Sequence, residues 1–403
     1  MQEADGQNPI DPVEASVIRG SNQTGMRAHN ERLVLSLIRK HGPMAKAAIA
    51  RITGLSAQTV SVIMRALEAD GLLVKGEPVR GKVGQPSVPM GLRAEGAYFL
   101  GLKVGRRSVE LVLTDFLGEV LQRAQALHSH PTPDATIAFA KTQTDRMLAT
   151  LDADQRNRVA GMGIAMPFFL WNWAQSLGVP PEDMAFWRVI DIRAEIAKLF
   201  DFPVYLQNDA SAACGAELVF GASDRPRDFL YFYVGFFIGG GVVLNGALFS
   251  GKGNSGALGP LPVPGKDGQV RQLLDVASLT GLENRLIGEG IDSASMWTSP
   301  GDWKIDETIL EDWITSAASG LAHSIVAACS VIDFQTVLID GWLPPDVRQR
   351  LVDAVMDCLD QHNMTGLTRP KVLPGSVGAD ARVLGAVSLP LSKRFLGETN
   401  DVA

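Results

Sequence analysis

The stretch Ile52–Leu73, ITGLSAQTVSVIMRALEADGLL, decides the fold of the first part of the chain. Gly54 predicts a tight turn, because a residue without a Cβ adopts a positive φ at little cost. Ser56 is suited to begin the next helix, since its hydroxyl can accept a hydrogen bond from a free amide of the first turn. The apolar stripe of that helix consists of Val60, Ile63, Met64 and Leu67. The stretch therefore predicts two helices joined by a glycine turn, the second of them amphipathic.

The flanking residues complete a small domain. The apolar side of a first helix, over 30–41, consists of Leu33, Val34, Leu37 and Ile38. The inward side of a second helix, over about 46–53, consists of Ala48, Ile49 and Ile52. After the third helix, LLVK (72–75) and GEPVRGKVGQPSVPM (76–90) predict a hairpin with Arg80 and Lys82 at its tip. Three helices and a hairpin in this order are typical of a winged helix-turn-helix.

The third helix also carries a polar stripe suited to the major groove of DNA. Gln58, Ser61 and Arg65 lie on one side at spacing i, i+3 and i+7. Gln58 can pair with adenine, whereas the hydroxyl and guanidinium groups can reach phosphates or base edges. The residues of helix and hairpin expected to contact double-stranded DNA are Ser56, Gln58, Thr59, Ser61, Arg65, Arg80 and Lys82. A protein-docking domain with a solvated basic face is the alternative for the same elements.

Charge is distributed unevenly along the chain. Residues 26–97 contain eleven Lys and Arg against five Asp and Glu, a net charge of +6, whereas residues 1–25 carry −3 and residues 98–403 carry −10. A basic module joined to an acidic body is expected when only one part of a protein meets a polyanion.

Length and composition place the chain among globular proteins of two or three domains, with 403 residues and 46% hydrophobic residues. The three cysteines have no close spacing, so neither a disulfide framework nor a zinc cluster is predicted. Residues 1–25 are polar and acidic, which predicts a loose tail without a targeting signal. No run reaches the roughly 18 apolar residues of a membrane helix. We therefore expect a cytoplasmic protein without a membrane partner.

The pattern changes to alternation beyond Gly96. Residues 97–127, AYFLGLKVGRRSVELVLTDFLGEVLQRAQAL, predict three antiparallel strands, followed by helix, strand and helix up to Asn208. A similar start recurs at 227–251, RDFLYFYVGFFIGGGVVLNGALFSG, as strand, glycine turn, strand, Asn-Gly turn and strand. The repeat predicts an α/β body of two related lobes with a cleft between them.

Five segments of the body resemble one known family. They are GLKVGRRSVELVLTDFLGEV (101–120), GIAMPFFL (163–170), LQNDASAACGAE (206–217), IGGGVVLNGALFSGKGNSGALGP (238–260) and VLIDGWLP (337–344). Together with the winged helix-turn-helix, this ordered series resembles the ROK family of repressors and sugar kinases over about residues 28–390. The resemblance implies an actin-like ATPase (ribonuclease H-like) body that binds sugar between its lobes. Kinase members lack the DNA-binding domain, so the architecture is similar to that of the transcriptional regulators.

The expected domains follow from this resemblance. They are a disordered tail at 1–25, the winged helix-turn-helix at 26–95, a first lobe at 96–208 and a second lobe at 209–403 whose C-terminal helix returns to the first lobe.

The kinase motifs of the family are degenerate in this chain. The family's first phosphate loop, Asp-x-Gly-Gly-Thr, is replaced by Lys103-Val104-Gly105-Arg106-Arg107, and a lysine repels the metal. In the second phosphate loop Gly235 is followed by Phe236 and Phe237, which would fill space that a phosphate needs. The adenosine-side glycine pair is reduced to Asp340-Gly341. We therefore predict no ATP-dependent phosphotransfer, no enzymatic activity and no cofactor.

The sugar side of the family's site is partly retained. Asn208 and Asp209 match the family's Asn-Asp, which implies contact with sugar hydroxyls. The alternative for Asp209 is a capping role at the start of the following helix. The family's Glu-Ile-Gly-His is replaced by Ala257-Leu258-Gly259-Pro260, and its cysteine-rich zinc loop is replaced by a segment without cysteine, so no metal is expected. A later family glutamate aligns with Leu274, beside Asp275.

Two features stay open. Trp171, Trp173 and Trp187 are candidates for stacking on a sugar ring or for core positions. Gln85 occupies the place of the arginine in the family's Gly-Arg-Pro wing and is included among the candidates for DNA contact, with Arg80 or Lys82 as the alternative source of the minor-groove contact.

These observations predict a transcriptional regulator, a repressor of carbohydrate-related genes, which binds an operator as a homodimer or homotetramer and responds to a sugar or sugar-derived effector. Two alternatives are a divergent ATP-dependent sugar kinase and a regulator whose body is only a dimerisation scaffold.

Overall fold

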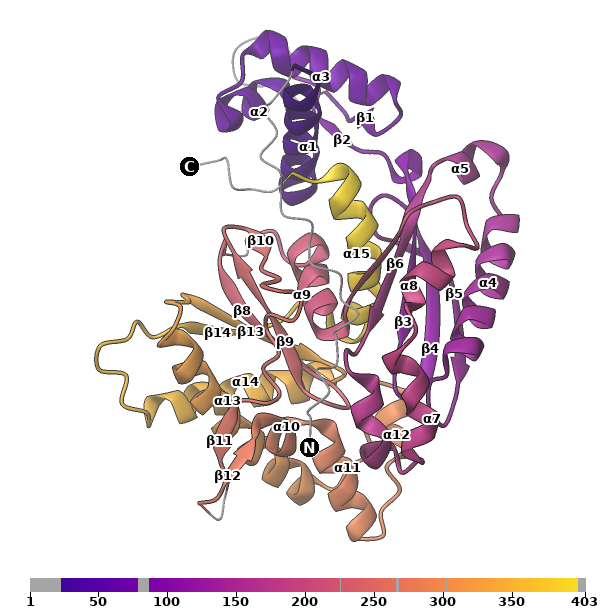
Figure 1. The fold of residues 1–403 in the computed structure, drawn as a ribbon. Coiled ribbons are helices and arrows are strands. Elements are labelled where there is room, and N and C mark those ends of the chain that lie inside the picture. Colours follow the sequence, from indigo (N-terminus) through magenta and orange to yellow (C-terminus); the bar gives the residue numbers. More distant parts are fainter. Residues whose placement is uncertain (1–22, 79–86, 225, 266–267, 302, 398–403) are drawn as a thin grey trace, which may run out of the picture. The chain divides into compact units, whose positions relative to one another are not determined.

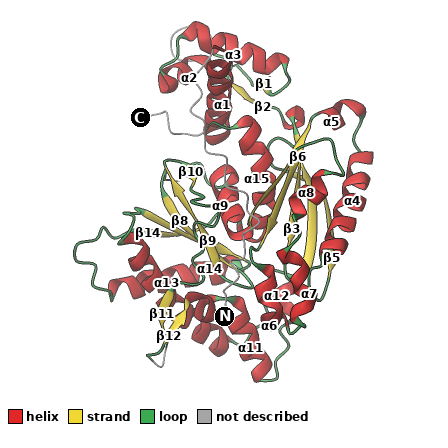
Figure 2. Ribbon diagram, viewed as in Figure 1, coloured by secondary structure: helices red, strands yellow, loops and turns green. Residues whose placement is uncertain are grey.

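The computed structural model describes residues 23–78, 87–224, 226–265, 268–301 and 303–397 (Figure 1). The chain divides into two compact units. The first unit holds the chain up to Asp209 together with the residues from Ala386 onward, and the second unit holds Ala210–Gly385. Each unit contains one five-stranded sheet with helices (Figure 2).

The first unit begins with a small domain, here called the head. It consists of α1 (Gln23–His41), α2 (Lys46–Thr53), α3 (Ala57–Ala69), β1 (Leu73–Lys75) and β2 (Met90–Leu92). The strands pair antiparallel, with Leu73 opposite Leu92, which confirms the strands of the predicted hairpin. Its buried apolar side chains include Val34, Ile38, Ile49, Val60 and Met64. The structure thus confirms three helices and a hairpin.

Local chemistry shapes the turn between α2 and α3. Gly54 has φ +69°, as predicted, and its amide donates to the carbonyl oxygen of Ala50.

No single helix among the described residues is long and apolar enough to span a membrane; α2 and α3 pass that test only as a pair bent by 120°. This bend is at the upper end of the 90–120° typical of a helix-turn-helix.

The structure of the head differs from the predictions at the start of α1 and at Ile52. α1 begins at Gln23, before the predicted start near residue 30 and inside the segment predicted as tail, because residues 23–29 are too polar to show an apolar period. Ile52, predicted to face inward, is 38% exposed, since it is the penultimate residue of a helix whose end lies open at the exposed Gly54. Arg80, Lys82 and Gln85 lie outside the described residues.

The first lobe contains the sheet β5-β4-β3-β6-β7. Its strands are β3 (Tyr98–Val104), β4 (Ser108–Thr114), β5 (Val120–Leu127), β6 (Val159–Met166) and β7 (Val204–Asn208). The first three are antiparallel, and β6 and β7 are parallel to β3. Its helices are α4 (Pro133–Ala149), α5 (Ala153–Asn157), α6 (Ala174–Leu177), α7 (Pro181–Ala185) and α8 (Ile192–Ala197).

The predicted antiparallel start of this lobe is confirmed, but the prediction of helix, strand and helix up to Asn208 missed β7. This strand has only five residues and ends in the polar Gln207 and Asn208, so it lacks the alternation by which strands are recognised.

The second unit repeats the topology with the order β10-β9-β8-β13-β14. Its sheet consists of β8 (Phe229–Val234), β9 (Gly239–Leu244), β10 (Ala247–Leu248), β13 (Thr336–Gly341) and β14 (Lys371–Pro374). Again an antiparallel meander is followed by two parallel strands. Asn245 and Gly246 both have positive φ, as expected for a tight hairpin turn. The predicted internal repeat is confirmed at the level of sheet order.

Helices and a small hairpin complete the second unit. The helices are α9 (Asp209–Phe220), α10 (Leu273–Ala277), α11 (Leu279–Gly288), α12 (Ala294–Thr298), α13 (Glu307–Cys329) and α14 (Pro345–Asp360), and the hairpin is β11 (Pro262–Pro264) with β12 (Val270–Gln272). The last helix, α15 (Ala381–Phe395), begins in this unit and ends in the first unit. Trp313 of α13 is 1% exposed in the core and donates from Nε1 to the carbonyl oxygen of Ser278. The boundary between the units falls inside α15, between Gly385 and Ala386.

Candidate nucleic-acid interface and degenerate kinase loops

Ser56 and Thr59 begin α3 as a capping pair. The amide of Thr59 donates to Ser56 Oγ at 3.1 Å, and the two hydroxyl oxygens are 2.8 Å apart. The predicted N-cap is therefore confirmed. Both hydroxyls take part in capping the first turn of α3, and Ser56 is exposed to solvent.

The polar face of α3 is open to solvent. Gln58 and Arg65 are exposed and Ser61 is partly buried, whereas Val60, Ile63, Met64 and Leu67 on the opposite side are buried. Arg65 Nε donates to the carbonyl oxygen of Ser61 at 3.2 Å, which holds the guanidinium along the helix. The structure thus brings Gln58, Ser61 and Arg65 onto one accessible face.

Lys46 contacts this polar face and was not singled out from the sequence. It is the first residue of α2, is exposed, and its Nζ donates to Ser61 Oγ at 3.4 Å. The available signal in the sequence was a basic residue at the start of α2, the helix that precedes α3. This contact adds a cation to the polar face, and cations are the groups that neutralise DNA phosphates.

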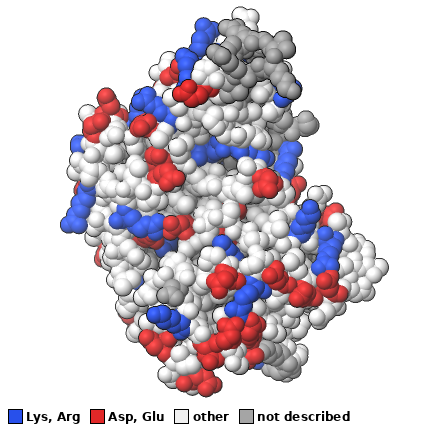
Figure 3. All heavy atoms as spheres, turned by 180° about the vertical axis from the view of Figure 1, so that it is seen from behind, with Lys and Arg blue, Asp and Glu red and all other residues white. Residues whose placement is uncertain are grey.

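The sign of the net charge differs between the head region, which is basic, and the rest of the chain, which is acidic. On the face in Figure 3, the largest groups of Asp and Glu side chains lie over the body. In the head, Lys75 pairs with Glu68 at 2.7 Å near the start of the hairpin. The predicted contacts at the hairpin tip lie in the part of the chain that the structure does not describe.

Two arginines join the head to the first lobe. Arg39 of α1 donates to the carbonyl oxygens of Phe116 and Leu117, and its guanidinium lies over the Phe116 ring, 5.3 Å from the centroid. Burial lowers the pKa of Arg39 to about 10, so the group stays charged at neutral pH. Arg158 Nη1 donates to the carbonyl oxygens of Asp70, at the end of α3, and Gly96.

The end of α15 also takes part in the contacts between the head and the first lobe. The Phe395 ring packs on Phe99 and Phe116, with centroid distances of 5.9 and 4.9 Å. Beyond the helix, the amide of Gly397 donates to Ser36 Oγ of α1 at 3.1 Å. The head is therefore fixed to the first lobe by polar and aromatic contacts.

The replaced first phosphate loop is occupied by an internal ion pair. Lys103 of β3 and Glu110 of β4 are directly opposite in the strand register, both are buried, and Lys103 Nζ lies 2.5 Å from Glu110 Oε2. Arg123 of β5 binds the other oxygen at 2.6 Å. The carboxylate that could have attracted a cation is thus used inside the sheet. The Lys103–Glu110 pair was not predicted, because it depends on the register between two strands.

The second phosphate loop is filled by aromatic rings. Phe236 is 9% exposed and packs on Phe237 and Trp297, with centroid distances of 4.7 and 5.7 Å. A Cβ on Gly240 would lie 2.3 Å from the carbonyl oxygen of Tyr231, and one on Gly241 would lie 2.4 Å from Cys214 Cβ. These glycines permit close packing of strand and helix.

Asp340 is locked in place where the family's adenosine-side motif has glycine. The residue is fully buried, and its carboxylate accepts from Arg348 Nη1 at 2.5 Å, Tyr231 Oη at 3.3 Å and the Gly378 amide at 2.8 Å. Burial raises the pKa of the Tyr231 phenol well above its ordinary value, so the phenol keeps its proton. Glu217 accepts from the amides of Ser376 and Val377. Two carboxylates therefore occupy the backbone amides of the loop after β14.

The predicted ligand residues lie at the end of β7. Asn208 is the last residue of β7 and Asp209 is the first residue of α9, so Asp209 belongs to the helix and does not precede it. Both side chains are partly buried. Asp275 is exposed and accepts from the amide of Gln272 in a capping box, which gives it a structural role. Trp187 is 4% exposed and donates to the carbonyl oxygen of Pro131, so this tryptophan belongs to the core.

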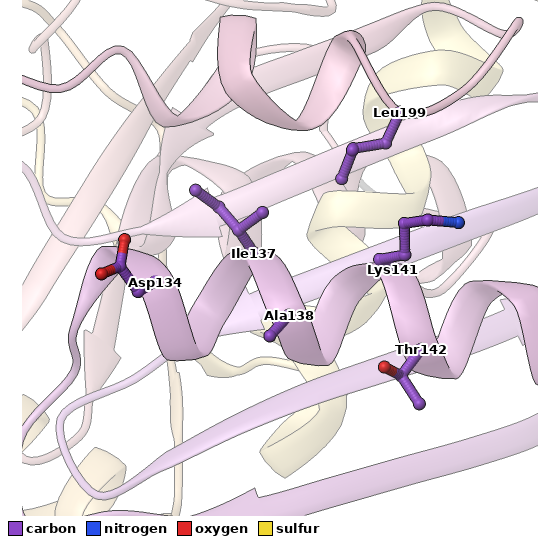
Figure 4. A pocket seen from close by; sticks show the side chains of 6 residues that line it. All are labelled: Asp134, Ile137, Ala138, Lys141, Thr142 and Leu199. Atoms are coloured by element: carbon purple, nitrogen blue, oxygen red, sulfur yellow. The ribbon is translucent and has the colours of Figure 1, made fainter.

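A depression on α4 has no relation to these residues. It is lined by Asp134, Ile137, Ala138, Lys141, Thr142 and Leu199. Figure 4 shows the Ile137 and Lys141 side chains on the side of α4 that faces Leu199. Lys141 is paired with Asp145 at 2.8 Å, and the depression offers no convergent set of polar groups for a sugar.

Two protein families match the chain, one over the body and one over the head. The ROK family matches residues 99–393, and a family described as winged helix-turn-helix DNA-binding matches residues 27–74. The chain belongs to the ROK family.

Similar proteins include regulators and an uncharacterized relative. An uncharacterized protein of Sinorhizobium fredii is 28% identical over 372 residues, 91% of each chain. The xylose repressor of Bacillus subtilis is 26% identical over 245 residues, 60% of this chain and 62% of the repressor. The crystal structure of a ROK family transcriptional regulator, a homolog of the Escherichia coli MLC protein, covers 93% of this chain and 98% of its own, with 21% identity and a TM-score of 0.65.

Kinases of the family share the fold of the body. A ROK family glucokinase from Streptomyces griseus is 18% identical, covers 73% of this chain and 99% of its own, and has a TM-score of 0.56. The α/β fold of the ROK body is thus common to regulators and kinases, whereas this ROK protein carries a winged helix-turn-helix in front of it.

Proposed function

We propose that this ROK protein is a DNA-binding transcriptional repressor. The observation that carries the proposal is the exposed polar face of α3, with Gln58, Ser61 and Arg65, in a domain that matches a DNA-binding family. Lys46 adds a cation at this face. The basic charge of residues 26–97 supports contact with a polyanion.

The residues proposed to contact DNA have different roles. Gln58 reads a base edge, and Arg65 and Lys46 bind phosphates. Ser56, Thr59 and Ser61 contribute hydroxyls near the start of α3, and Arg80, Lys82 and Gln85 contribute from the hairpin. Because a single winged helix buries too little surface for tight specific binding, we propose at least a dimer on an operator with two half-sites.

The body is proposed to sense a sugar-like ligand without phosphorylating it. Asn208 and Asp209 provide the polar groups for its hydroxyls. The ion pair at Lys103, the rings at Phe236 and Phe237 and the buried Asp340 each occupy a position that nucleotide binding needs. The relation to carbohydrate genes is inferred from the xylose repressors among the similar proteins.

The test is mapping of bound sites across the genome with the full chain, followed by binding to the fragments found at several salt concentrations. Log affinity should fall linearly with log salt, with a slope of about −0.9 per phosphate contact. The neighbouring genes would indicate the ligand. Should the protein ignore genomic fragments and consume ATP with a sugar acceptor, the proposal is wrong.

Two substitutions separate base reading from phosphate binding. Gln58→Ala should reduce discrimination between operator variants, by about 1–3 kcal/mol for the loss of a bidentate pair. Lys46→Ala should weaken binding to all sequences and make the salt slope shallower. Equilibrium binding to the operator and to a scrambled duplex measures both effects, and equal effects of the two substitutions on both duplexes would contradict the assignment.

A further inference from the structure

Val62 lies on the face of α3 that the proposed function assigns to DNA. Gln58, Ser61, Val62 and Arg65 follow the spacing i, i+3, i+4 and i+7, which places them on one side of the helix. Val62 is 46% exposed, whereas Val60, Ile63, Met64 and Leu67 are buried on the other side. α3 lies along the top of the head in Figure 1. A branched apolar side chain thus lies in the middle of an otherwise polar face.

Folding alone does not explain a valine at this position. In a helix, β-branched side chains lose χ1 freedom, and valine is less favourable than alanine by several tenths of a kcal/mol. Half of the Val62 side chain gains nothing from burial. Single exposed valines are common on protein surfaces, so the groups around Val62 decide whether it has a role.

The neighbours of Val62 are groups suited to a DNA groove. Lys46 Nζ and Arg65 Nε both donate to Ser61, to Oγ at 3.4 Å and to the carbonyl oxygen at 3.2 Å. These contacts hold two cations beside the residue that precedes Val62. Gln58, one turn earlier, exposes its amide. Phosphate contacts through the cations would fix the helix in the groove and bring Val62 against the base edges.

The major groove contains one apolar group, the C5-methyl of thymine, and cytosine has a hydrogen at that position. We propose that Val62 is a specificity-determining residue that selects a thymine in each operator half-site by contact with this methyl group. The proposal rests on the proposed DNA-binding function. Val62 follows Gln58 by about 6 Å along the helix axis, so the thymine lies within about two base pairs of the base that Gln58 reads.

The test uses the full chain and duplexes it selects itself from a random double-stranded library. In the enriched duplex, single thymines are replaced by deoxyuridine, which removes only the methyl group. The wild type should lose about fourfold in affinity at one thymine per half-site, equivalent to ~0.8 kcal/mol for one buried methyl-sized group. Val62→Ala should bind the two duplexes equally, and its thermal unfolding should match the wild type because alanine favours the helix.

Two control variants test whether the methyl effect belongs to Val62. Val74→Ala removes a valine of the same head that is 48% exposed but lies on β1, and it should keep the preference for thymine over deoxyuridine. Gln58→Ala should lose a preference at a different base pair and keep the methyl effect. The inference is overturned if removal of each thymine methyl leaves wild-type affinity unchanged, or if Val62→Ala retains the fourfold loss. If the full chain enriches no sequence at all, the proposed function itself fails and this inference with it, a result distinct from tight binding without a methyl effect.

Discussion

Lys103 and Glu110 form a buried ion pair at the position that aligns with the family's first phosphate loop. A buried charge is tolerated only when it is paired and hydrogen-bonded. Here the lysine and Arg123 share one carboxylate between neighbouring strands, and Asp340 is held in the same way by Arg348 in the second unit. At both positions a residue that replaces part of a nucleotide-binding motif is satisfied by the protein itself. At the residue scale, the degenerate motifs have become parts of the folded core.

Lys103→Met should therefore destabilise the first lobe. The substitution leaves Glu110 buried with Arg123 as its remaining cation, and breaking a buried pair costs about 3 kcal/mol at the lower end of the usual range. Hydrogen exchange at the amides of β3 and β4 should become faster. The double variant Lys103→Met with Glu110→Leu should recover most of the protection, since both buried charges are gone and the Arg123 side chain, 40% exposed, stays in contact with water. A single variant as well protected as the wild type would contradict a structural role for the pair.

At the scale of elements, the head is joined to the first lobe at three points. Arg39 of α1 contacts the turn after β4, Arg158 contacts the end of α3, and the end of α15 contacts α1 through Gly397 and Ser36. α3 is thus tied to a lobe whose last strand, β7, ends at Asn208. We propose that a change in the first lobe reaches α3 through these packed elements.

Arg158→Ala should loosen the end of α3. The substitution removes the donor to the carbonyl oxygens of Asp70 and Gly96, so amide exchange should increase at 70–73 and operator affinity of the full chain should fall severalfold. Arg156→Ala is the matched control, because Arg156 contacts only carbonyl oxygens of the first lobe, those of Ala149 and Leu151, in the bonds the structure shows. If amide hydrogen exchange at 70–73 in Arg158→Ala is as slow as in the wild type, the Arg158 contacts do not hold the end of α3.

At the scale of the whole molecule, the two units share one sheet order, and α9 and α15 run across their boundary in the chain. Gly385 of α15 packs on α9, where a Cβ would lie 2.1 Å from the carbonyl oxygen of Ala212. In the first unit, a Cβ on Gly163 of β6 would lie 1.8 Å from the carbonyl oxygen of Ala386. Within the second unit α15 thus packs on α9, and within the first unit it packs on β6. We propose that ligand binding at Asn208 and Asp209 acts on the head through the first unit, to which both residues and the head belong.

The sensor role predicts stabilisation by a ligand. A sugar, polyol or sugar phosphate that binds the folded protein should raise its Tm, by the equivalent of about 2.7 kcal/mol at a concentration of 100 Kd. Asn208→Ala and Asp209→Ala should abolish the increase, whereas Asp201→Ala, an exposed aspartate before β7, should keep it. A thermal-shift screen over a broad panel measures the effect. If no compound stabilises the wild type, the body is a scaffold for dimerisation.

Sequence reasoning succeeded where signals are local. The turn at Gly54, the cap at Ser56 and the buried stripe of α3 each depend on residues within a few positions. The repeated meander was also recognised, because alternation and turns recur in the same order. β7 and the exposed end of α2 at Ile52 were missed, since a short strand and a helix end give weak periodic signals.

The amino-acid sequence by itself determined the winged helix-turn-helix and the doubled sheet-and-helix body, because propensity, periodicity and motif spacing are properties of neighbouring residues. Only the tertiary structure decided that Lys103 pairs with Glu110, that Arg348 holds Asp340, that Lys46 reaches Ser61 and that Arg39 and Arg158 bind the head to the first lobe. The physical reason is that these are contacts across strands and between elements, whose partners are set by register and packing and not by distance along the chain.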